Sequence, residues 1–73
     1  MKQILFAERL KSLRLEEGLT QTELATATGL SQSAITAWEV GTNSPKAMAI
    51  VLLAEYFNVT TDYILGVSDF KTL

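Results

Sequence analysis

The chain has 73 residues, 48% of them hydrophobic and 19% charged, with one proline, and this balance predicts one small folded domain instead of a disordered segment. Neither cysteine nor histidine is present, which excludes disulfides, thiolate chemistry, a cysteine–histidine zinc site and a histidine general base. Six basic residues against eight acidic ones give a net charge of -2 and a pI near 4.9, whereas nucleic-acid-binding domains are typically basic.

The carboxylates are scattered along the chain and form no catalytic constellation, so we expect no catalytic residue, no metal, no cofactor and no enzymatic activity. No apolar run approaches the ~20 residues of a membrane span. Residues 1–5 also lack the basic region and long apolar core of a signal peptide. The sequence therefore predicts a cytoplasmic protein that has no membrane partner.

The first expected helix runs from about Ile4 to Glu17. Phe6, Leu10 and Leu13 recur at i, i+4 and i+7 and predict its inner face. Gly18 is expected to end this helix. Arg14 lies near its C-terminal end, where a cation is favoured by the helix dipole.

The stretch from 20 to 40 carries the clearest local signals in the chain. Thr20 is a good N-cap and Glu23 follows three residues later, which together make a capping box and start a helix at Gln21. Gly29 suits the left-handed end of that helix. Ser31 can then cap a second short helix.

This second helix has two unlike faces. Ala34, Ile35 and Trp38 form an inward stripe, and the opposite face is small, neutral and rich in hydrogen-bonding groups: Gln32, Ser33, Thr36 and Ala37. A glutamine can pair with the N6 and N7 atoms of adenine in the DNA major groove. Solvated polar residues are equally ordinary at a helix start, so these residues taken alone leave both interpretations open.

The loop from Gly41 to Pro45 separates this pair from an apolar helix that we expect to end at Phe57. Ser44 is expected to cap it and Pro45 to take its first position, where a missing N–H costs nothing. Asn58 is expected to close it in a left-handed conformation. Thr60 or Thr61 would then cap a last short helix over residues 62–65.

The segment from Phe6 to Gly66 resembles the helix-turn-helix domain of phage repressors, Cro proteins and Xre-type bacterial regulators. The resemblance is carried in one register by FAERLKSLR from Phe6, GLTQTELA from Gly18, GLSQSAITAWE from Gly29 and NVTTDYILG from Asn58. It implies an all-α, compact five-helix fold of the lambda-repressor type. Residues 1–73 would be a single DNA-binding domain, with its helix-turn-helix at 21–40 and a tail at 67–73.

The resemblance further implies a transcriptional regulator of repressor type that binds double-stranded operator DNA as a homodimer. Base edges would be read by Gln32, Ser33, Thr36 and Ala37, and phosphates would be contacted by Gln21, Thr42, Asn43 and Lys46. Arg14 would pair with Glu39 and tie the first helix to the reading helix.

The apolar helix departs from the family pattern. Between residues 47 and 57 only Glu55 is charged, and the resemblance assigns Ala47, Ile50, Val51, Leu53, Ala54 and Phe57 to the core. One outer stripe is left over, formed by Met48, Leu52 and Tyr56. At the first two of these positions the family commonly places polar or charged side chains. Either the C-terminal tail covers this stripe through Phe70, or another protein chain does.

The sequence does not determine the operator, the sign of regulation, the inducer or the gene controlled, and two structural questions stay open as well. Residues 67–73 are either a dimer contact or the start of a linker to a further domain. The stripe of Met48, Leu52 and Tyr56 also permits an alternative function, a protein-interaction module of antitoxin or antirepressor type.

Overall fold

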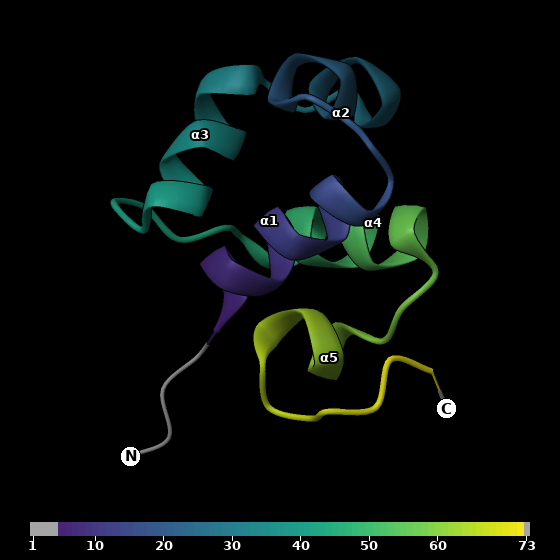
Figure 1. Ribbon diagram of the computed structural model, residues 1–73. Helices are drawn as coiled ribbons and strands as arrows, with labels where there is room; N and C mark the ends of the chain where they lie inside the picture. The colour runs from purple at the N-terminus through teal and green to yellow at the C-terminus, as the bar shows by residue number, and fades with distance from the viewer. Residues whose placement is uncertain (1–4, 73) are drawn as a thin grey trace.

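The computed structural model describes residues 5–72, and this part of the chain forms five helices without a strand (Figure 1). The predicted all-α, five-helix fold is therefore confirmed. The helices are α1 (Phe6–Glu16), α2 (Gln21–Thr28), α3 (Gln32–Val40), α4 (Ala47–Phe57) and α5 (Thr61–Leu65).

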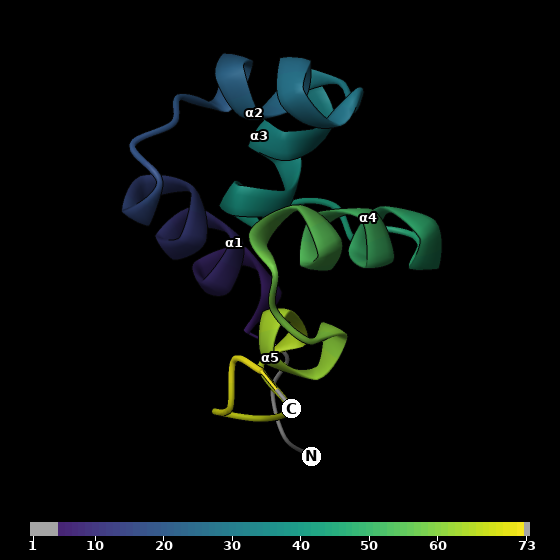
Figure 2. The same cartoon turned by 90° about the vertical axis from the view of Figure 1, so that its right-hand side faces the viewer.

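The helices are arranged in three levels. α2 and α3 form one end of the molecule, α1 and α4 cross its middle, and α5 with the described tail lies at the opposite end (Figures 1 and 2). The pair formed by α2 and α3 is therefore presented away from the C-terminal tail.

Every helix contributes to one hydrophobic core. The aromatic rings of Phe6 and Trp38 meet edge to face, with centroids 6.2 Å apart, and join α1 to α3. The buried hydrophobic residues recur at helical spacing in α1 and α3, are adjacent pairs in α2 and α4, and include one residue of α5. They are Phe6, Leu10, Leu13, Leu24, Ala25, Ile35, Trp38, Leu53, Ala54 and Ile64.

The predicted signals of the 20–40 stretch are confirmed. The Thr20 hydroxyl accepts the Glu23 backbone N–H at 3.0 Å, and the Glu23 carboxylate accepts the Thr20 N–H at 2.8 Å. Gly29 ends α2 at a φ of 77°, and the Ser31 hydroxyl caps α3 by accepting the N–H of Ala34 at 3.1 Å. These contacts join residues within three positions of one another, which is why sequence alone predicts them.

The ends of the other helices differ from expectation by small amounts. α1 begins at Phe6 and ends at Glu16, with Glu17 as its C-cap, and the predicted start at Ile4 lies outside the described residues. Asn58 closes α4 at a φ of 57° as predicted. Thr60 caps α5 by accepting the N–H of Tyr63, so that α5 starts one residue earlier than predicted.

The predicted start of α4 is wrong. The helix begins at Ala47, because Lys46 is still extended (φ -82°, ψ 165°) and takes the N-cap position without a side-chain cap. Ser44 does not cap it. Its backbone N–H is instead bound by the Asn43 side-chain oxygen at 2.9 Å, which makes a local turn that keeps the chain out of the helix.

The predicted core face of α4 is partly wrong as well. Leu53 and Ala54 are buried, with Ile50 and Phe57 half-buried beside them. Ala47 is exposed and Val51 is 41% exposed, whereas Ala49, which the sequence analysis did not assign to the core, packs against it. The helix thus buries a narrower stripe than its composition indicates.

The tail is held against α1 and α5. The Arg9 guanidinium donates to the backbone oxygens of Tyr63 at 2.7 Å and Ser68 at 3.0 Å, and also binds the Asp69 carboxylate. The backbone N–H of Thr60 donates to the Lys71 oxygen at 2.7 Å. These bonds attach the segment that follows α5 to the rest of the fold.

Gly66 sits where the chain after α5 meets the start of α1. Its φ is 85°, and a Cβ added there would lie 2.6 Å from the Leu5 Cβ and 2.7 Å from the Leu5 N. Leu5 is held in place by the bond from its N–H to the Leu65 oxygen at 3.0 Å. A glycine is thus required at position 66 for two reasons: the positive φ of its backbone and the close approach of Leu5 at the start of α1.

We predict that Gly66→Ala lowers the free energy of unfolding by ~3 kcal/mol, because it adds a steric clash to the cost of a left-handed residue. The matched control is Gly29→Ala, which has a similar φ of 77° and open space around the new methyl group. It should cost ~1 kcal/mol. Urea titration of the two variants measures the difference, and equal costs would contradict the role of the Leu5 contact.

Candidate functional site

The α2–turn–α3 unit presents the N-terminal half of α3 to solvent. Leu24 and Ala25 of α2 and Ile35 of α3 are buried in the common core, so the relative orientation of the two helices is set by the core. Gly29 donates its N–H to the Ala25 oxygen at 2.9 Å, and the chain turns into α3 two residues later. The first turn of α3 is left uncovered.

The outward face of α3 contains the four predicted base-reading residues. Gln32 and Ser33 are exposed in the first turn, and Thr36 and Ala37 are half-buried one turn later. Val40 continues this face at the end of the helix and is 68% exposed. Apart from Glu39, which is turned inward, α3 carries no charged residue.

The predicted pairing of Arg14 with Glu39 is present. The guanidinium donates from Nε to Oε2 at 2.7 Å and from NH2 to Oε1 at 2.9 Å, a bidentate arrangement. Its NH1 donates to the Leu19 oxygen at 2.8 Å. The two side chains are only 10% and 4% exposed. The pair therefore joins α1 to the end of α3 inside the protein.

Gln21 extends this pair into a network that the sequence analysis did not anticipate. Its Nε2 donates to Glu39 Oε1 at 3.0 Å, and its Oε1 accepts the hydroxyl proton of Thr36 at 2.6 Å. A predicted phosphate contact and a predicted base contact are thus bonded to each other. Gln21 keeps one Nε2 proton for another acceptor. Gln21 is separated along the chain by 15 residues from Thr36 and by 18 residues from Glu39, so no local sequence pattern indicates these bonds.

The network keeps Glu39 ionised. Burial raises the pKa of this carboxyl, but the hydrogen bonds from Arg14 and Gln21 and the positive charges of Arg14 and Lys11 outweigh burial. The pKa of Glu39 therefore lies below its ordinary value. The bond to Glu39 also raises the pKa of Arg14.

Lys11 is a basic residue near this network that sequence reasoning missed. It lies on exposed surface and close enough to Glu39 to lower the pKa of its carboxyl. Its position three residues before Arg14, on the same face of α1, is the signal that could have identified it. Within residues 5–72, Lys11 and Lys46 are the basic side chains that form no ion pair with a carboxylate, whereas Arg9, Arg14 and Lys71 do.

The other predicted phosphate contacts follow the end of α3. Thr42 donates its backbone N–H to the Ala37 oxygen at 3.0 Å and closes the helix. Asn43 and Lys46 are exposed, and the Asn43 side-chain oxygen is used by Ser44, which leaves its amide N–H groups available. Thr42 and Asn43 thus lie together beside the last turn of α3, and Lys46 lies at the start of α4.

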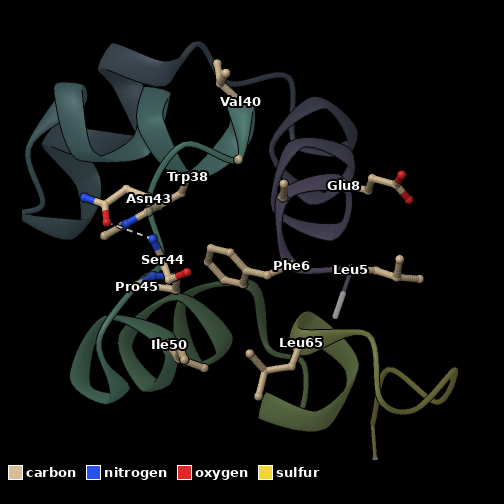
Figure 3. Close-up of a pocket in the computed structure, with 12 residues that line it drawn as sticks. Leu5, Phe6, Glu8, Trp38, Val40, Asn43, Ser44, Pro45, Ile50 and Leu65 are labelled. Carbon is tan, nitrogen blue, oxygen red and sulfur yellow. Dashed lines mark hydrogen bonds between the residues drawn. The ribbon is translucent and has the colours of Figure 1, made fainter. Parts of the chain in front are cut away.

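An open groove lies beneath this loop (Figure 3). It is lined by the start of α1, the end of α3, the loop and the end of α5, with mainly apolar walls from Phe6, Trp38, Pro45, Ile50 and Leu65. Glu8 is the titratable residue at its edge, and its carboxylate points away from the groove in Figure 3. The groove therefore offers no charged group to a ligand.

The outer stripe of α4 remains uncovered. Met48 is 78% exposed, and Leu52 and Tyr56 are also exposed, together with Val51 beside them. The tail packs on α1 and α5, and Phe70 is itself 78% exposed. Covering of the stripe by Phe70, one of the two expected possibilities, is therefore wrong for the described residues.

In residues 5–72 no helix combines the length and apolar character that crossing a membrane requires.

We predict that Arg14 and Glu39 show a coupling energy of ~1–3 kcal/mol at pH 7 in a double-mutant cycle of Arg14→Met and Glu39→Gln, measured by urea unfolding. Because the pKa of Glu39 is lowered by folding, this coupling is complete above the ordinary carboxyl pKa and is lost as pH falls through the lowered value.

The exposed pair of Lys71 and Glu16, at 3.2 Å, is the matched control for this cycle. Solvent screens it, so its coupling should stay below ~1 kcal/mol. A coupling of zero for Arg14 and Glu39 at pH 7 would contradict the role given to their pair.

Known proteins are similar to this chain in sequence and in fold. A helix-turn-helix family model, HTH_3, matches residues 10–64. The chain is 34% identical over 65 residues to the uncharacterized HTH-type transcriptional regulator YobD of Bacillus subtilis, covering 89% of this chain and 58% of that protein. It is likewise 34% identical over 65 residues to the cryptic phage CTXphi transcriptional repressor RstR of Vibrio cholerae, covering 89% of this chain and 59% of RstR.

The fold is also that of a solved repressor. The P22 c2 repressor, crystallised in complex with synthetic operator 9T, superposes with a TM-score of 0.79 at 24% identity, over 93% of this chain and all of that one. The chain spans somewhat more than half the length of YobD and RstR. Because the family model covers most of the chain, from the middle of α1 to the end of α5, the protein belongs to the helix-turn-helix family of DNA-binding domains.

Proposed function

We propose that this protein is a transcriptional regulator of repressor type that binds operator DNA sequence-specifically as a homodimer. The observation that carries the proposal is the uncovered outer face of α3, which is neutral, hydrogen-bonding in its first turn and held by a buried ion pair. A helix of this kind fits the major groove. The relatives include a protein named as a repressor and one named as an activator, so similarity supports transcriptional regulation and disfavours a protein-interaction module as the main role, while repression remains our proposal.

In the proposed complex the first turn of α3 supplies hydrogen bonds to base edges. Gln32 is exposed, and its side-chain amide can donate a hydrogen bond to N7 of adenine while its side-chain oxygen accepts one from N6. Ser33 lies beside it, and its hydroxyl can donate or accept. Ala37, one turn further, offers a methyl group.

Phosphate contacts would come from both sides of α3. Gln21 has a remaining Nε2 proton at the first position of α2, where unpaired backbone N–H groups also favour an anion. On the other side, the Asn43 amide and the Lys46 ammonium lie between α3 and α4. The Thr42 hydroxyl lies there too and donates to the Ala37 oxygen over a long 3.4 Å, a bond that it would exchange for one to a phosphate. Lys11 adds a further candidate beside the network.

The charge distribution sets how strongly one protomer can bind. Three basic side chains of residues 5–72 form ion pairs with carboxylates, Arg14 in the interior and Arg9 and Lys71 at the surface, and Lys11 and Lys46 form none. Affinity that comes from released counterions is therefore small, and its dependence on salt is shallow. A homodimer would compensate for the low affinity of one protomer, since its two copies of α3 bind the same operator. Because its partner would be bacterial or phage operator DNA, its proposed place of action is the cytoplasm.

We expect the exposed α4 face formed by Met48, Val51, Leu52 and Tyr56 to be the surface through which two copies meet. Sedimentation velocity at increasing protein concentration should then show a dimer that Met48→Glu combined with Leu52→Lys shifts to monomer. The matched control is Thr22→Glu with Thr26→Lys, an exposed pair of the same spacing on α2, which should leave the dimer unchanged. An identical distribution for all three proteins would rule out this surface.

The function itself is tested by selecting duplexes from a random-sequence DNA pool at low salt. The wild type should enrich a site with two-fold symmetry. Gln32→Ala should lose ~1–3 kcal/mol of binding free energy and relax specificity at one base pair of each half-site. Thr61→Ala, an exposed polar substitution at the opposite end of the molecule, is the control and should select the wild-type site. Enrichment of no sequence by the wild type would refute the proposed function.

A further inference from the structure

The outward face of α3 changes its chemistry along its length. The first turn carries the amide of Gln32 and the hydroxyl of Ser33, whereas the second half carries Thr36, Ala37 and the 68%-exposed Val40. Thr36 is the residue whose contribution the sequence leaves undecided, because threonine has both a hydroxyl and a methyl group on Cβ. The structure resolves which of them faces inward.

The hydroxyl of Thr36 is committed to the interior network. It lies 2.6 Å from Gln21 Oε1. The Gln21 amide cannot be reversed without penalty, since its Nε2 donates to the Glu39 carboxylate and a reversed amide would set oxygen against oxygen. Glu39 is in turn held as an anion by Arg14. The direction of each hydrogen bond is therefore determined, and Thr36 must give its single proton to Gln21.

This arrangement leaves apolar groups for the second half of the reading face. The hydroxyl keeps acceptor lone pairs but has no proton left for a base acceptor such as thymine O4 or guanine O6, and the methyl is the other heavy group on the Thr36 Cβ. Ala37 has a methyl group alone, and Val40 has two. The base feature in the major groove that favours such contacts is the C5-methyl group of thymine.

Building on the proposed function, we propose that Thr36 and Ala37 recognise thymine C5-methyl groups, with Gln21 as the residue that positions the Thr36 methyl. The operator half-site would then combine a position read by the Gln32 amide with neighbouring thymines read by methyl contacts. In the second half of the helix, specificity would come from van der Waals contact, whereas in its first turn it would come from hydrogen bonds.

The test replaces single thymines by deoxyuridine, which lacks the C5-methyl group and keeps the Watson–Crick pairing. The probe is the duplex that the wild-type protein selects from the random pool, with each thymine replaced in turn. We expect one or two positions in each half-site at which deoxyuridine weakens binding about fourfold, which corresponds to ~0.8 kcal/mol for one buried methyl group.

Two matched variants separate the methyl from the hydroxyl. Thr36→Ser keeps the hydroxyl and removes the methyl, so it should bind thymine and deoxyuridine equally at one of these positions. Thr36→Val keeps a methyl and removes the hydroxyl, so it should retain the preference for thymine. Gln21→Leu should reduce the thymine preference at the same position, a readout that loss of stability alone would not change.

The outcomes distinguish this inference from the proposed function. A selected duplex that tolerates deoxyuridine at every thymine would overturn the methyl contacts while leaving sequence-specific binding intact. A thymine preference that Thr36→Ser retains and Thr36→Val loses would overturn the assignment to Thr36. Failure of the wild type to select any duplex would remove the proposed function and this inference together.

Discussion

The buried ion pair between Arg14 and Glu39 is the interaction on which the placement of the outward face of α3 depends. It crosses from α1 to the end of α3, and both side chains are almost fully removed from solvent. Such a pair is costly to desolvate and adds little net stability over apolar packing, but loss of one partner leaves a buried charge without compensation. Its main physical consequence is therefore geometric. It holds α3 at one orientation, and through Gln21 it reaches the Thr36 hydroxyl on the face proposed to contact DNA.

The ion pairs also limit how many cations this acidic chain can offer to DNA. Arg9 is occupied by the tail, Arg14 by Glu39 and Lys71 by Glu16, so few cations remain for phosphate groups. In the proposed complex, binding that gains little from counterion release would depend more on contacts with the bases and on the pairing of two protomers. A neutral reading helix with an amide at one end and methyl groups at the other is consistent with that balance.

The opposite end of the molecule is organised by Arg9. Its guanidinium stacks over the Tyr63 ring at 4.1 Å and binds the backbone on both sides of Gly66, which fastens the described tail to α5 and α1. The tail is thus used in closing this end of the core and leaves α4 untouched. An apolar helix face that the described chain does not cover is a feature that self-association would account for.

The sequence by itself determined the features that rest on contacts between near neighbours or on helical periodicity. These include the capping box at Thr20, the Ser31 cap, the left-handed residue Asn58 and the five-helix pattern. The pairing of Arg14 with Glu39 was reachable through family resemblance, not through any local signal. Tertiary structure alone decided the late start of α4, the exposure of Val51 and the bond that joins Gln21 to Thr36. The physical reason is the same in each case: hydrogen bonds and burial between residues far apart in the chain depend on how whole helices pack, and periodicity within one helix does not encode that packing.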